Sequence, residues 1–450
     1  MIELLRAAAA KDPEQVAIVS ATGRLTYAEL VGRAERTATA LQARGATRFA
    51  ALDSDPAVIW TLLAAGSLAG AESCIYPPAA PDSDIATLRE RFGHALLISS
   101  RELPGQPDVV RPDDLLGPDR LVAEPPAGPR PLLILTSGTT GPSKAAVHDW
   151  SRVLRMAEGV QATPEHRWLL AYGLNQFGGL QILIHVAAAM ATLVAGESFR
   201  PRDGLAAMRR WDVTHASGTP TFWRFLLAEL RGDGGPVPPL RQVSLSGEAV
   251  PASLLEQLKQ AFPQARLSQI YGATEMGQTI TVRDGRAGLP LSFLEDGEVT
   301  FKVVDGELWV RTRSAMLGYF GEQSAASDAA DSWRPTGDLV EIVDDRIQFR
   351  GRKTDVINVG GVKIHPLPIE ELVCRVEGVA LARVFGRPNA MVGHIVALEV
   401  VPQPGADEDE LRDMIRTACA DLPPAARPRS IKIVPSLAMP GNKVIRGVEQ

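Results

Sequence analysis

The sequence predicts an α/β protein with a large N-terminal domain, residues 1–350, and a small α+β C-terminal domain, residues 351–450. Three observations lead to this prediction. A chain of 450 residues is too long for one hydrophobic core. Residues 243–271 read as strand, helix and strand, which favours a right-handed parallel crossover. From about Gly351 onward, hairpin and helix patterns alternate without a parallel repeat.

The first elements follow from helix signals. Thr26 and Glu29 have capping-box spacing, and the helical pattern that follows stops at Gly45. Residues 57–70 are small and apolar and predict a buried helix. The stretch AEPPAGPRP, residues 123–131, is too rich in proline for an element, so it predicts a connector. The apolar run 132–135 is then a buried strand that ends in a glycine-rich loop.

The later elements follow in the same way. Between the strands at 243–246 and 266–271, ASLLEQLKQAF has helical apolar spacing with Pro251 near its start. Asp305-Gly306 separates two alternating apolar runs and predicts a hairpin. The C-terminal region predicts a glycine hairpin, helices near 368–376 and 407–420, and strands at 380–386 and 394–401.

Composition excludes several function classes. The 47 basic and 53 acidic side chains are mixed along the chain and give a net charge of −6, which argues against a nucleic acid partner. Cys74, Cys374 and Cys419 lack the spacing of a metal site or a disulfide framework, which fits a reducing compartment. We see no signal peptide and no run of about 20 apolar residues. We therefore expect a cytoplasmic protein without a membrane span.

The glycine-rich loop TSGTTGPSK, residues 136–144, combines glycines, hydroxyls and a lysine. It is not a Walker-type P-loop, because Ser143 replaces the second glycine and Ala145 follows Lys144. Its backbone N–H groups, hydroxyls and lysine can still hold an oxyanion. The alternative is an ordinary turn between two elements.

Five further stretches follow in order along the chain. They are SGE at 246–248, YGATE at 271–275, TGD at 336–338, GRKTD at 351–355 and GNK at 441–443. Together with the loop they resemble the adenylate-forming ligases, the AMP-binding superfamily of acyl- and aryl-CoA synthetases, peptide-synthetase adenylation domains and luciferase. The resemblance runs from Leu25 to Lys443. It implies a large multi-sheet domain with parallel sheets and helices that binds ATP and acid, and a mobile C-terminal lid domain.

The resemblance also assigns nucleotide roles. It implies that Tyr271 stacks on the adenine, Asp338 accepts hydrogen bonds from the ribose hydroxyls and Arg352 donates to the ribose. The resemblance implies further nucleotide-binding residues at the adenine, namely Gly247, Glu248, Ala249 and Gly272. The loop residues that would hold the β- and γ-phosphates are Thr136, Ser137, Gly138, Thr139, Thr140, Gly141 and Lys144.

Three residues would carry the chemistry. Thr274 would touch the α-phosphate region, and Glu275 would hold Mg²⁺, a cation that prefers carboxylate and phosphate oxygens. Lys443 would reach between the acid and the α-phosphate, where negative charge builds up. The alternatives are a surface carboxylate for Glu275 and a solvated tail lysine for Lys443.

The acid and the acceptor have their own candidates. Gln176 stands where many relatives carry a histidine, and Thr354 stands at a hinge that is usually Asp or Lys. Gly360 and Gly361 leave room for a thiol arm, although a tight hairpin also needs such glycines. The predicted acid pocket comprises Gln176, Phe177, Gly178, Ser217, Gly218, Thr219, Gly247, Ala273 and Met276.

These assignments predict an AMP-forming acid–thiol ligase. It would activate a carboxylic acid, with an aromatic acid as the leading hypothesis, using ATP and Mg²⁺, and would release pyrophosphate. The acyl group would pass to coenzyme A. The alternatives are transfer to a carrier-protein phosphopantetheine or to an amine, and a non-catalytic binder of acyl groups or nucleotides.

Overall fold

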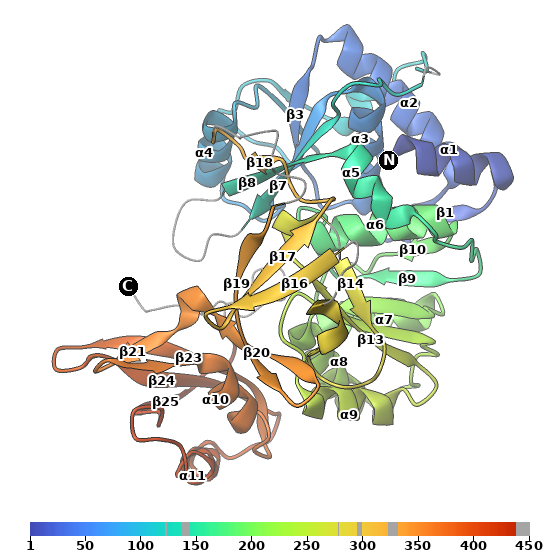
Figure 1. Cartoon of the computed structure of the whole chain (residues 1–450). Helices are drawn as coiled ribbons and strands as arrows, with labels where there is room; N and C mark the ends of the chain where they lie inside the picture. The colour runs from blue at the N-terminus through green and yellow to red at the C-terminus, as the bar shows by residue number, and fades with distance from the viewer. Residues whose placement is uncertain (122–123, 137–143, 278, 295–298, 323–331, 438–450) are drawn as a thin grey trace.

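The computed structural model describes most of the chain (Figure 1). The described residues are 1–121, 124–136, 144–277, 279–294, 299–322 and 332–437. Within them, parallel sheets with helices form the N-terminal part and a separate α+β unit follows, as predicted. No helix among these residues is both long and apolar enough to span a membrane.

A seven-stranded sheet holds the strand that leads into the glycine-rich loop. Its order is β18-β8-β7-β4-β3-β5-β6, and β4, β3 and β5 run parallel to β7. The strands are β3 (Arg48–Leu52), β4 (Glu72–Ile75), β5 (Leu96–Ser99), β6 (Val109–Val110), β7 (Pro131–Thr136), β8 (Lys144–Asp149) and β18 (Gly318–Tyr319). Antiparallel β7 and β8 flank the loop, so its two ends leave the sheet side by side.

The helices around this sheet follow the predicted signals. Helix α2 (Tyr27–Ala43) begins after a capping box between Thr26 and Glu29, and α3 (Pro56–Ala69) ends at the left-handed Gly70. Both pack with α1 (Ile2–Lys11) in one apolar cluster, while α4 (Asp82–Phe92) belongs to another. The remaining short segments here are α5 (Trp150–Val153) and the 3₁₀ turns η1 (Pro112–Leu115) and η2 (Leu154–Ala157).

An eight-stranded sheet forms the second layer, in the order β14-β13-β12-β11-β9-β10-β1-β2. The run from β13 to β1 is parallel, and β2 and β14 are antiparallel edges. The strands are β1 (Val16–Ser20), β2 (Gly23–Thr26), β9 (Arg167–Leu170), β10 (Thr192–Val194), β11 (His215–Gly218), β12 (Gln242–Ser246), β13 (Arg266–Gly272) and β14 (Thr279–Val282). The predicted crossover is present as β12, α9 (Ala252–Ala261) and β13.

Helices cover both faces of this sheet. Helix α6 (Phe177–Ala189) packs on the face that carries Trp168 and Leu170, in the same apolar cluster as α1–α3, so it lies between the two sheets (Figure 1). Helices α7 (Pro201–Arg210), α8 (Pro220–Asp233) and α9 pack with Leu169 and Val243 on the opposite face. Alternating side chains on β9 therefore serve two different cores.

An antiparallel sheet, ordered β15-β20-β19-β17-β16, packs beside β13. It contains the predicted Asp305-Gly306 hairpin, in which both turn residues have positive φ. Its strands are β15 (Leu289–Pro290), β16 (Val299–Val304), β17 (Glu307–Thr312), β19 (Arg334–Val343) and β20 (Arg346–Arg352), and short 3₁₀ turns occur at η3 (Thr274–Met276) and η4 (Leu291–Leu294).

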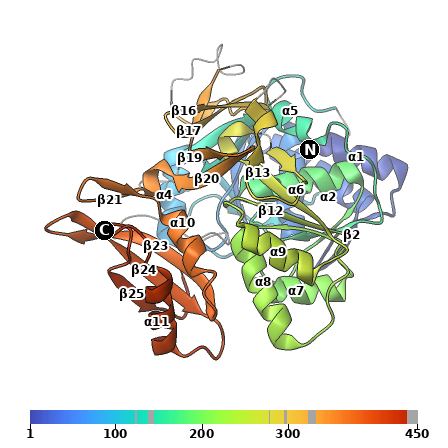
Figure 2. The same ribbon diagram turned by 60° about the horizontal axis from the view of Figure 1, so that its bottom comes forward.

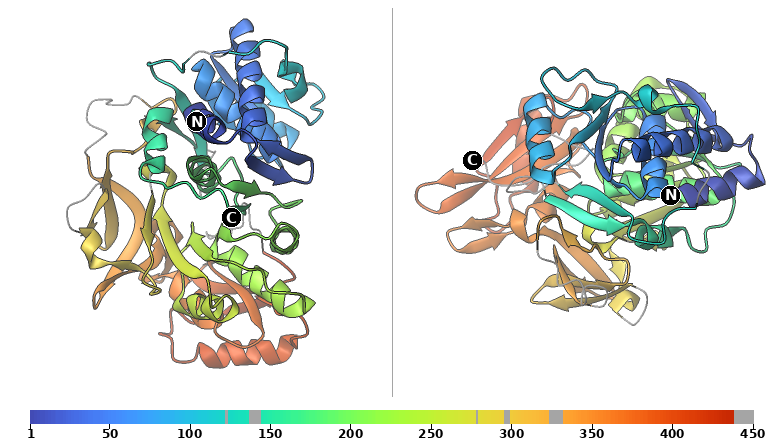
Figure 3. Two further views of the ribbon diagram at one scale, coloured as in Figure 1. Left: turned by 90° about the vertical axis from the view of Figure 1, so that its right-hand side faces the viewer. Right: turned by 90° about the horizontal axis from the view of Figure 1, so that it is seen from above.

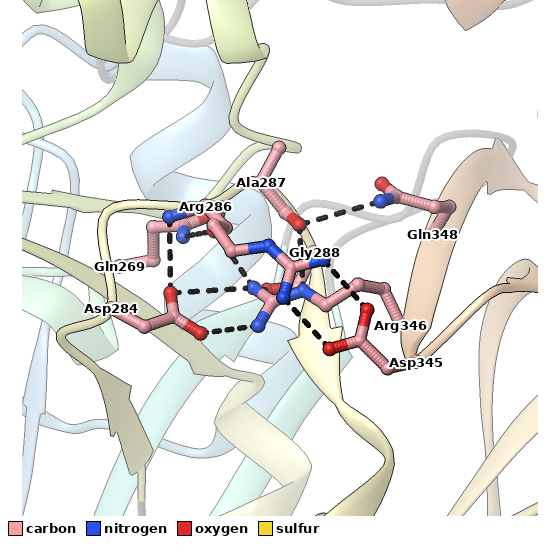
Figure 4. A network of polar contacts seen from close by, with 8 residues as sticks. All are labelled: Gln269, Asp284, Arg286, Ala287, Gly288, Asp345, Arg346 and Gln348. Atoms are coloured by element: carbon pink, nitrogen blue, oxygen red, sulfur yellow. Dashed lines mark hydrogen bonds and ion pairs between the residues drawn. The ribbon is translucent and has the colours of Figure 1, made fainter.

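A polar network fastens this sheet to the eight-stranded one (Figure 4). The buried Arg346 guanidinium pairs with Asp284 and donates to the carbonyls of Ala287 and Gly288, at 3.1 and 2.6 Å. Gln269 of β13 donates to the carbonyl of Arg286. Since β13 and β20 both supply predicted nucleotide residues, this network sets their relative positions.

The C-terminal unit has its own sheet and core. The sheet is ordered β22-β21-β24-β23, with β25 parallel to β24. Its elements are η5 (Lys353–Asp355), β21 (Ile357–Val359), β22 (Val362–Ile364), α10 (Pro366–Val373), β23 (Val379–Asn389), β24 (Gly393–Pro402), α11 (Glu408–Ala418) and β25 (Ser430–Ile433). In Figure 2 and the right-hand view of Figure 3 the unit, coloured orange to red, stands to one side of the N-terminal layers.

This unit packs on the N-terminal part through α8. Phe225 of α8 lies against an apolar group that includes Leu381 and Val401. The predicted boundary between residues 350 and 351 falls inside β20, the last strand of the antiparallel sheet. The two-domain boundary therefore remains a prediction.

Candidate active site

Asp338, Tyr271 and Arg352 meet in one cluster although they are distant in sequence. The Tyr271 hydroxyl donates to Asp338 Oδ2 over 2.7 Å, and Arg352 Nε lies 2.8 Å from Asp338 Oδ1. Asp338 and Arg352 are paired across β19 and β20, while Tyr271 comes from β13. Three residues that the resemblance assigned to adenine and ribose thus lie together.

The Asp338 carboxylate changes the pKa values of both of its neighbours in this cluster. The Asp338 carboxylate raises the pKa of Arg352, which keeps the guanidinium charged. Burial, and then the charge of Asp338, raise the pKa of Tyr271 well above its usual value. Tyr271 is therefore a hydrogen-bond donor at all physiological pH values, and the carboxylate has two fixed donors.

Aromatic residues that sequence reasoning missed hold the Tyr271 ring. Phe349 of β20 stacks on it, with ring centroids 5.1 Å apart and 29° between the planes. Phe301 of β16 meets it edge-on at 5.7 Å. Packing on this side fixes the plane of the ring that would stack on adenine. The apolar alternation of RIQFRGR was the only signal in the sequence for Phe349.

The Thr336-Gly337-Asp338 turn is fixed by its own hydrogen bonds. The Asp338 N–H donates to Thr336 Oγ1 at 3.1 Å, and Thr336 Oγ1 donates to the Leu308 carbonyl at 2.7 Å. The Gly337 N–H donates to Glu307 Oε1 at 3.1 Å, and the positive φ of Gly337, 76°, favours glycine. The Asp338 carboxylate is therefore oriented before any ligand binds.

Glu275 lies beside the strands that flank the glycine-rich loop. Tyr319 of β18 donates its hydroxyl to Glu275 Oε1 over 2.7 Å, and β18 pairs with β8. Lys144, the first residue of β8, holds its ammonium 4.6 Å from the centre of the Tyr319 ring. Lys144 and Glu275 are thus on the same side of the molecule, while Ser137, Gly138, Thr139, Thr140 and Gly141 lie outside the described residues.

The described residues contain no group of three or more His, Cys, Asp or Glu side chains that could hold a metal ion. Glu275 is a single carboxylate without a second protein ligand in such a group. This arrangement fits Mg²⁺, which is commonly held by one or two carboxylates, substrate phosphates and water.

The turn that carries Thr274 and Glu275 is held by a buried histidine. His148 Nε2 donates to the Thr274 carbonyl over 2.8 Å, and the Met316 N–H donates to the Glu275 carbonyl at 3.0 Å. Gly277 ends the turn at φ 62°, and a Cβ there would lie 1.8 Å from the Ser314 carbonyl oxygen. Only glycine fits, so this turn is a rigid support for Glu275.

The predicted acid-pocket residues gather at one edge of the eight-stranded sheet. Ser217 and Gly218 end β11, Gly247 follows β12, and Gln176, Phe177 and Gly178 begin α6. Ala273 and Met276 follow β13. This is the carboxyl edge of the parallel strands, where ligands of such sheets bind.

Several of these residues also have packing roles. A Cβ on Gly218 would lie 2.5 Å from the Phe222 ring, and a Cβ on Gly178 would lie 3.3 Å from the Tyr172 ring. Met276 is 1% exposed within the core below Tyr271. The Glu248 carboxylate accepts from the Thr221 N–H at 2.9 Å, at the beginning of α8. Glu248 therefore connects the adenine region to the helix on which the C-terminal unit packs.

The predicted hinge residue Thr354 follows Arg352 by two residues, whereas the predicted acceptor glycines belong to a hairpin of the C-terminal unit. Thr354 is exposed, and its hydroxyl donates to Asp355 Oδ1 at 3.2 Å. Gly360 and Gly361 form the tip of the β21–β22 hairpin at φ 57° and 90°, and no atom lies within 4 Å of a Cβ built on Gly361. Gly360 and Gly361 are exposed, and Lys443 lies outside the described residues.

Comparison with known proteins identifies the family. The model of AMP-binding enzymes matches residues 5–320, and that of their C-terminal domain matches residues 368–443. The chain belongs to the AMP-binding enzyme family. The prediction of an adenylate-forming ligase relationship is confirmed.

Relatives of this AMP-binding enzyme include acid–CoA ligases. Feruloyl-CoA synthase of Amycolatopsis sp is 29% identical over 97% of this chain and 95% of that protein. The 2-succinylbenzoate–CoA ligase of Bacillus subtilis (strain 168) is 29% identical over 64% of this chain and 62% of that protein. The fatty acid–[acyl-carrier-protein] ligase ScoC of Streptomyces coeruleorubidus is 28% identical over 82% of this chain and 73% of that protein.

Solved structures confirm the predicted fold class. The anthranilate CoA ligase AuaEII in complex with anthranoyl-AMP has a TM-score of 0.86 at 19% identity, covering 98% of this chain and 94% of that one. The o-succinylbenzoate CoA synthetase of Bacillus subtilis in complex with its acyl-adenylate has a TM-score of 0.79 at 23% identity, covering 98% and 96%.

The buried His148 gives the enzyme a specific pH dependence of stability. Burial lowers the pKa of His148 to about 4, whereas in the unfolded chain it is about 6.5. Only the unfolded chain takes up this proton between these pH values, so the stability that neutral His148 contributes is complete above pH 6.5 and is lost toward pH 4.

We expect His148→Gln to reduce the rise of unfolding free energy with pH by up to about 1.4 kcal/mol per pH unit within this window. Urea denaturation at several pH values from 4.5 to 7 measures the change. Burial also lowers the pKa values of His185 and His215, to about 4 and about 3. These two histidines still contribute to the pH dependence of stability in the variant. An unchanged slope would contradict the account of His148.

Proposed function

We propose that this enzyme activates a carboxylic acid with ATP and Mg²⁺ and then transfers the acyl group to a thiol, with coenzyme A as the acceptor. The observation that carries the proposal is the Tyr271–Asp338–Arg352 cluster, which lies at the ligand-binding edge of a parallel sheet. Family membership and the acid–CoA ligases among the relatives support it.

In the first step the acid carboxylate attacks the α-phosphorus of ATP, and pyrophosphate leaves. Because the acid carboxylate and the ATP phosphates are both anions, catalysis depends on positioning the two reactants and on cations that stabilise the negative charge of the transition state. The ribose is held at Asp338 and Arg352, and the adenine packs on Tyr271. Glu275 would hold Mg²⁺, which would neutralise phosphate charge. Lys144 and the glycine-rich loop would hold the outer phosphates, and Lys443 would stand between the acid and the α-phosphate.

In the second step a thiol attacks the acyl-adenylate and AMP leaves. Residues 351–450 act as a mobile lid with its hinge at Thr354, and the Gly360-Gly361 tip lines the path of the thiol arm after the lid turns. The tip is exposed, so the proposal requires the lid to turn before the tip can line this path.

The leading candidate for the acid is an aromatic carboxylic acid of modest size, which binds at Gln176, Phe177, Gly178, Ser217 and the neighbouring predicted residues. The feruloyl-CoA synthase among the relatives supports this assignment. A carrier-protein phosphopantetheine is the second candidate acceptor, and the carrier-protein ligase among the relatives favours it over an amine. We also propose a cytoplasmic location, which the three free cysteines support.

The direct test is acid-dependent exchange of radioactive pyrophosphate into ATP. Exchange with one or more carboxylic acids supports the ligase. Absence of exchange with every acid of a broad panel favours a non-catalytic binder. Consumption of coenzyme A, compared with loading of a phosphopantetheinylated carrier protein, then decides the acceptor.

Lys443→Ala should lower the rate of pyrophosphate exchange by about 10²–10³-fold, because the transition state loses a cation where charge builds up. Lys432→Ala is the matched control, since Lys432 is an exposed lysine on β25 of the same unit. Its exchange rate should equal that of the wild type. Full exchange in Lys443→Ala would show that this lysine is not catalytic.

Gly361→Trp should leave pyrophosphate exchange intact and abolish thioester formation, because the side chain fills the path of the thiol arm. Gly405→Trp is the matched control: Gly405 has φ 86°, close to the 90° of Gly361, and is equally open. Both variants carry the same backbone strain. The tunnel role is wrong if the two variants form thioester equally well or if Gly361→Trp loses exchange as well.

A further inference from the structure

Tyr319 of β18 contacts two of the charged residues that are predicted to bind the ATP phosphates and their cation. Its hydroxyl donates to Glu275 Oε1 over 2.7 Å, and the Lys144 ammonium lies 4.6 Å from the centre of its ring. Lys144 begins β8 directly after the glycine-rich loop, whereas Glu275 belongs to the turn η3 that follows β13. One side chain outside all of the sequence motifs therefore joins the predicted phosphate site to the predicted Mg²⁺ site.

The strand β18 determines where the Tyr319 ring points. Tyr319 is paired with Ala146 of β8, and the Phe320 N–H donates to the Ala145 carbonyl at 2.8 Å. Phe320 packs edge-on against Phe92, with 5.6 Å between the ring centroids, in the apolar cluster that includes α4. Because successive side chains along a strand point to opposite faces of the sheet, Tyr319 points away from this cluster.

The Tyr319 hydroxyl fixes one oxygen of the Glu275 carboxylate. Burial, and then the charge of Glu275, raise the pKa of Tyr319, so the hydroxyl stays a donor at physiological pH. The Met316 N–H donates to the Glu275 carbonyl at 3.0 Å, which holds the backbone of the same residue. Within the described part of the chain no group donates to Glu275 Oε2, and this oxygen is left for a hard cation.

The Tyr319 ring keeps Lys144 apart from Glu275. The Lys144 ammonium is attracted to the face of the ring, while the carboxylate is bound at the hydroxyl on the ring's edge. Among the described residues Lys144 forms its ion pair with Glu322, at 3.5 Å, and none with Glu275. A direct pair between Lys144 and Glu275 would neutralise both the cation for the phosphates and the carboxylate for Mg²⁺.

The ion pair that Lys144 does form is easily replaced. The Lys144 and Glu322 side chains are 53% and 57% exposed, and solvent weakens a pair of this kind. Phosphate oxygens of ATP can therefore take the place of Glu322. Lys144 is then positioned by the ring and remains available to its ligand.

We infer that Tyr319 is a positioning residue for the first step of the reaction. Its hydroxyl orients Glu275 toward Mg²⁺, and its ring prevents Lys144 and Glu275 from pairing, so that both charges are available to ATP and its cation. The inference rests on the proposed function, because it takes Glu275 and Lys144 as the residues that hold Mg²⁺ and phosphate.

The test is calorimetric binding of ATP in excess Mg²⁺ and in EDTA, without any acid, so that no adenylate forms. The ratio of the dissociation constant in EDTA to that in Mg²⁺ is the Mg²⁺ effect. In the wild type it should be about tenfold or more, because Glu275 adds a charged ligand to the cation. Tyr319→Phe should lower it by about tenfold, as expected when a metal ligand loses its orienting partner.

The two functions of Tyr319 are separated by a second variant. Tyr319→Phe keeps the ring, so its ATP affinity in EDTA should stay within about threefold of the wild type. Tyr319→Leu removes the ring as well and should bind ATP in EDTA about fivefold more weakly, since an exposed ion pair between Lys144 and Glu275 must first break. When Glu275→Gln is added, the two Tyr319 variants should bind ATP in EDTA equally, within about twofold.

Tyr76→Phe is the matched control. The Tyr76 hydroxyl bonds His94 Nδ1 at 2.8 Å, in the apolar cluster against which Phe320 packs. This variant also loses one tyrosine hydroxyl bond, but at a residue with no contact to Glu275. Its Mg²⁺ effect should stay within about twofold of the wild type, whatever the change in stability.

The outcomes separate the inference from the proposed function. If the wild type binds ATP equally well in Mg²⁺ and in EDTA, the Mg²⁺ role of Glu275 is wrong and the inference falls with it. If the wild type has the Mg²⁺ effect and Tyr319→Phe keeps it, only the inference is overturned. It is also overturned if Tyr76→Phe loses as much of the effect as Tyr319→Phe. Should Tyr319→Leu fail to fold by circular dichroism, Tyr319→Phe decides alone.

Discussion

The Asp338 carboxylate is the interaction on which the candidate active site depends. It accepts from Tyr271 on the parallel sheet and pairs with Arg352 at the end of the antiparallel sheet. Its two donors are fixed in turn by Phe349 and by the Thr336 carbonyl, which accepts from Arg352 Nη1 at 2.9 Å. A ribose bound here would contact Arg352, the last residue of the strand that precedes the C-terminal unit. Asp338 and Arg352 would then connect nucleotide binding to the position of the proposed lid.

A second set of contacts brings the phosphate side to the same place. His148 supports the Thr274 turn from the seven-stranded sheet, and Tyr319 connects Glu275 to that sheet as well. The strand that precedes the glycine-rich loop and the one that follows it are neighbours of these residues. The residues predicted to bind the nucleotide and its phosphates therefore include groups from all three N-terminal sheets, which adjoin here.

The sequence predicted local structure well because the signals are local. The capping box at Thr26, the hairpin at Asp305-Gly306 and the crossover from β12 to β13 depend on neighbouring residues and appear as expected. The nucleotide residues were predicted through the resemblance of short motifs to a family. The boundary at residue 350 was placed from the change in sequence pattern alone, and it stays a prediction; it falls within β20.

The supporting residues could not be predicted in this way. His148 and Thr274 are 126 residues apart, and Tyr319 and Glu275 are 44 apart, so their contacts exist only after the sheets assemble. Phe349 was visible only as one apolar residue of a strand. Glycines at 178 and 218 were assigned to the pocket, and the structure adds a packing reason for each.

The most direct measurement for the central claim is calorimetric binding of AMP and of 2′,3′-dideoxy-AMP to the wild type and to Asp338→Ala. If Asp338 holds the ribose hydroxyls, the wild type binds AMP about 10–100-fold more tightly than the dideoxy nucleotide, as expected for hydrogen bonds to a charged group. In Asp338→Ala the two affinities should become equal within about threefold. A ratio that is the same in both proteins would contradict the assignment of Asp338 and the site built around it.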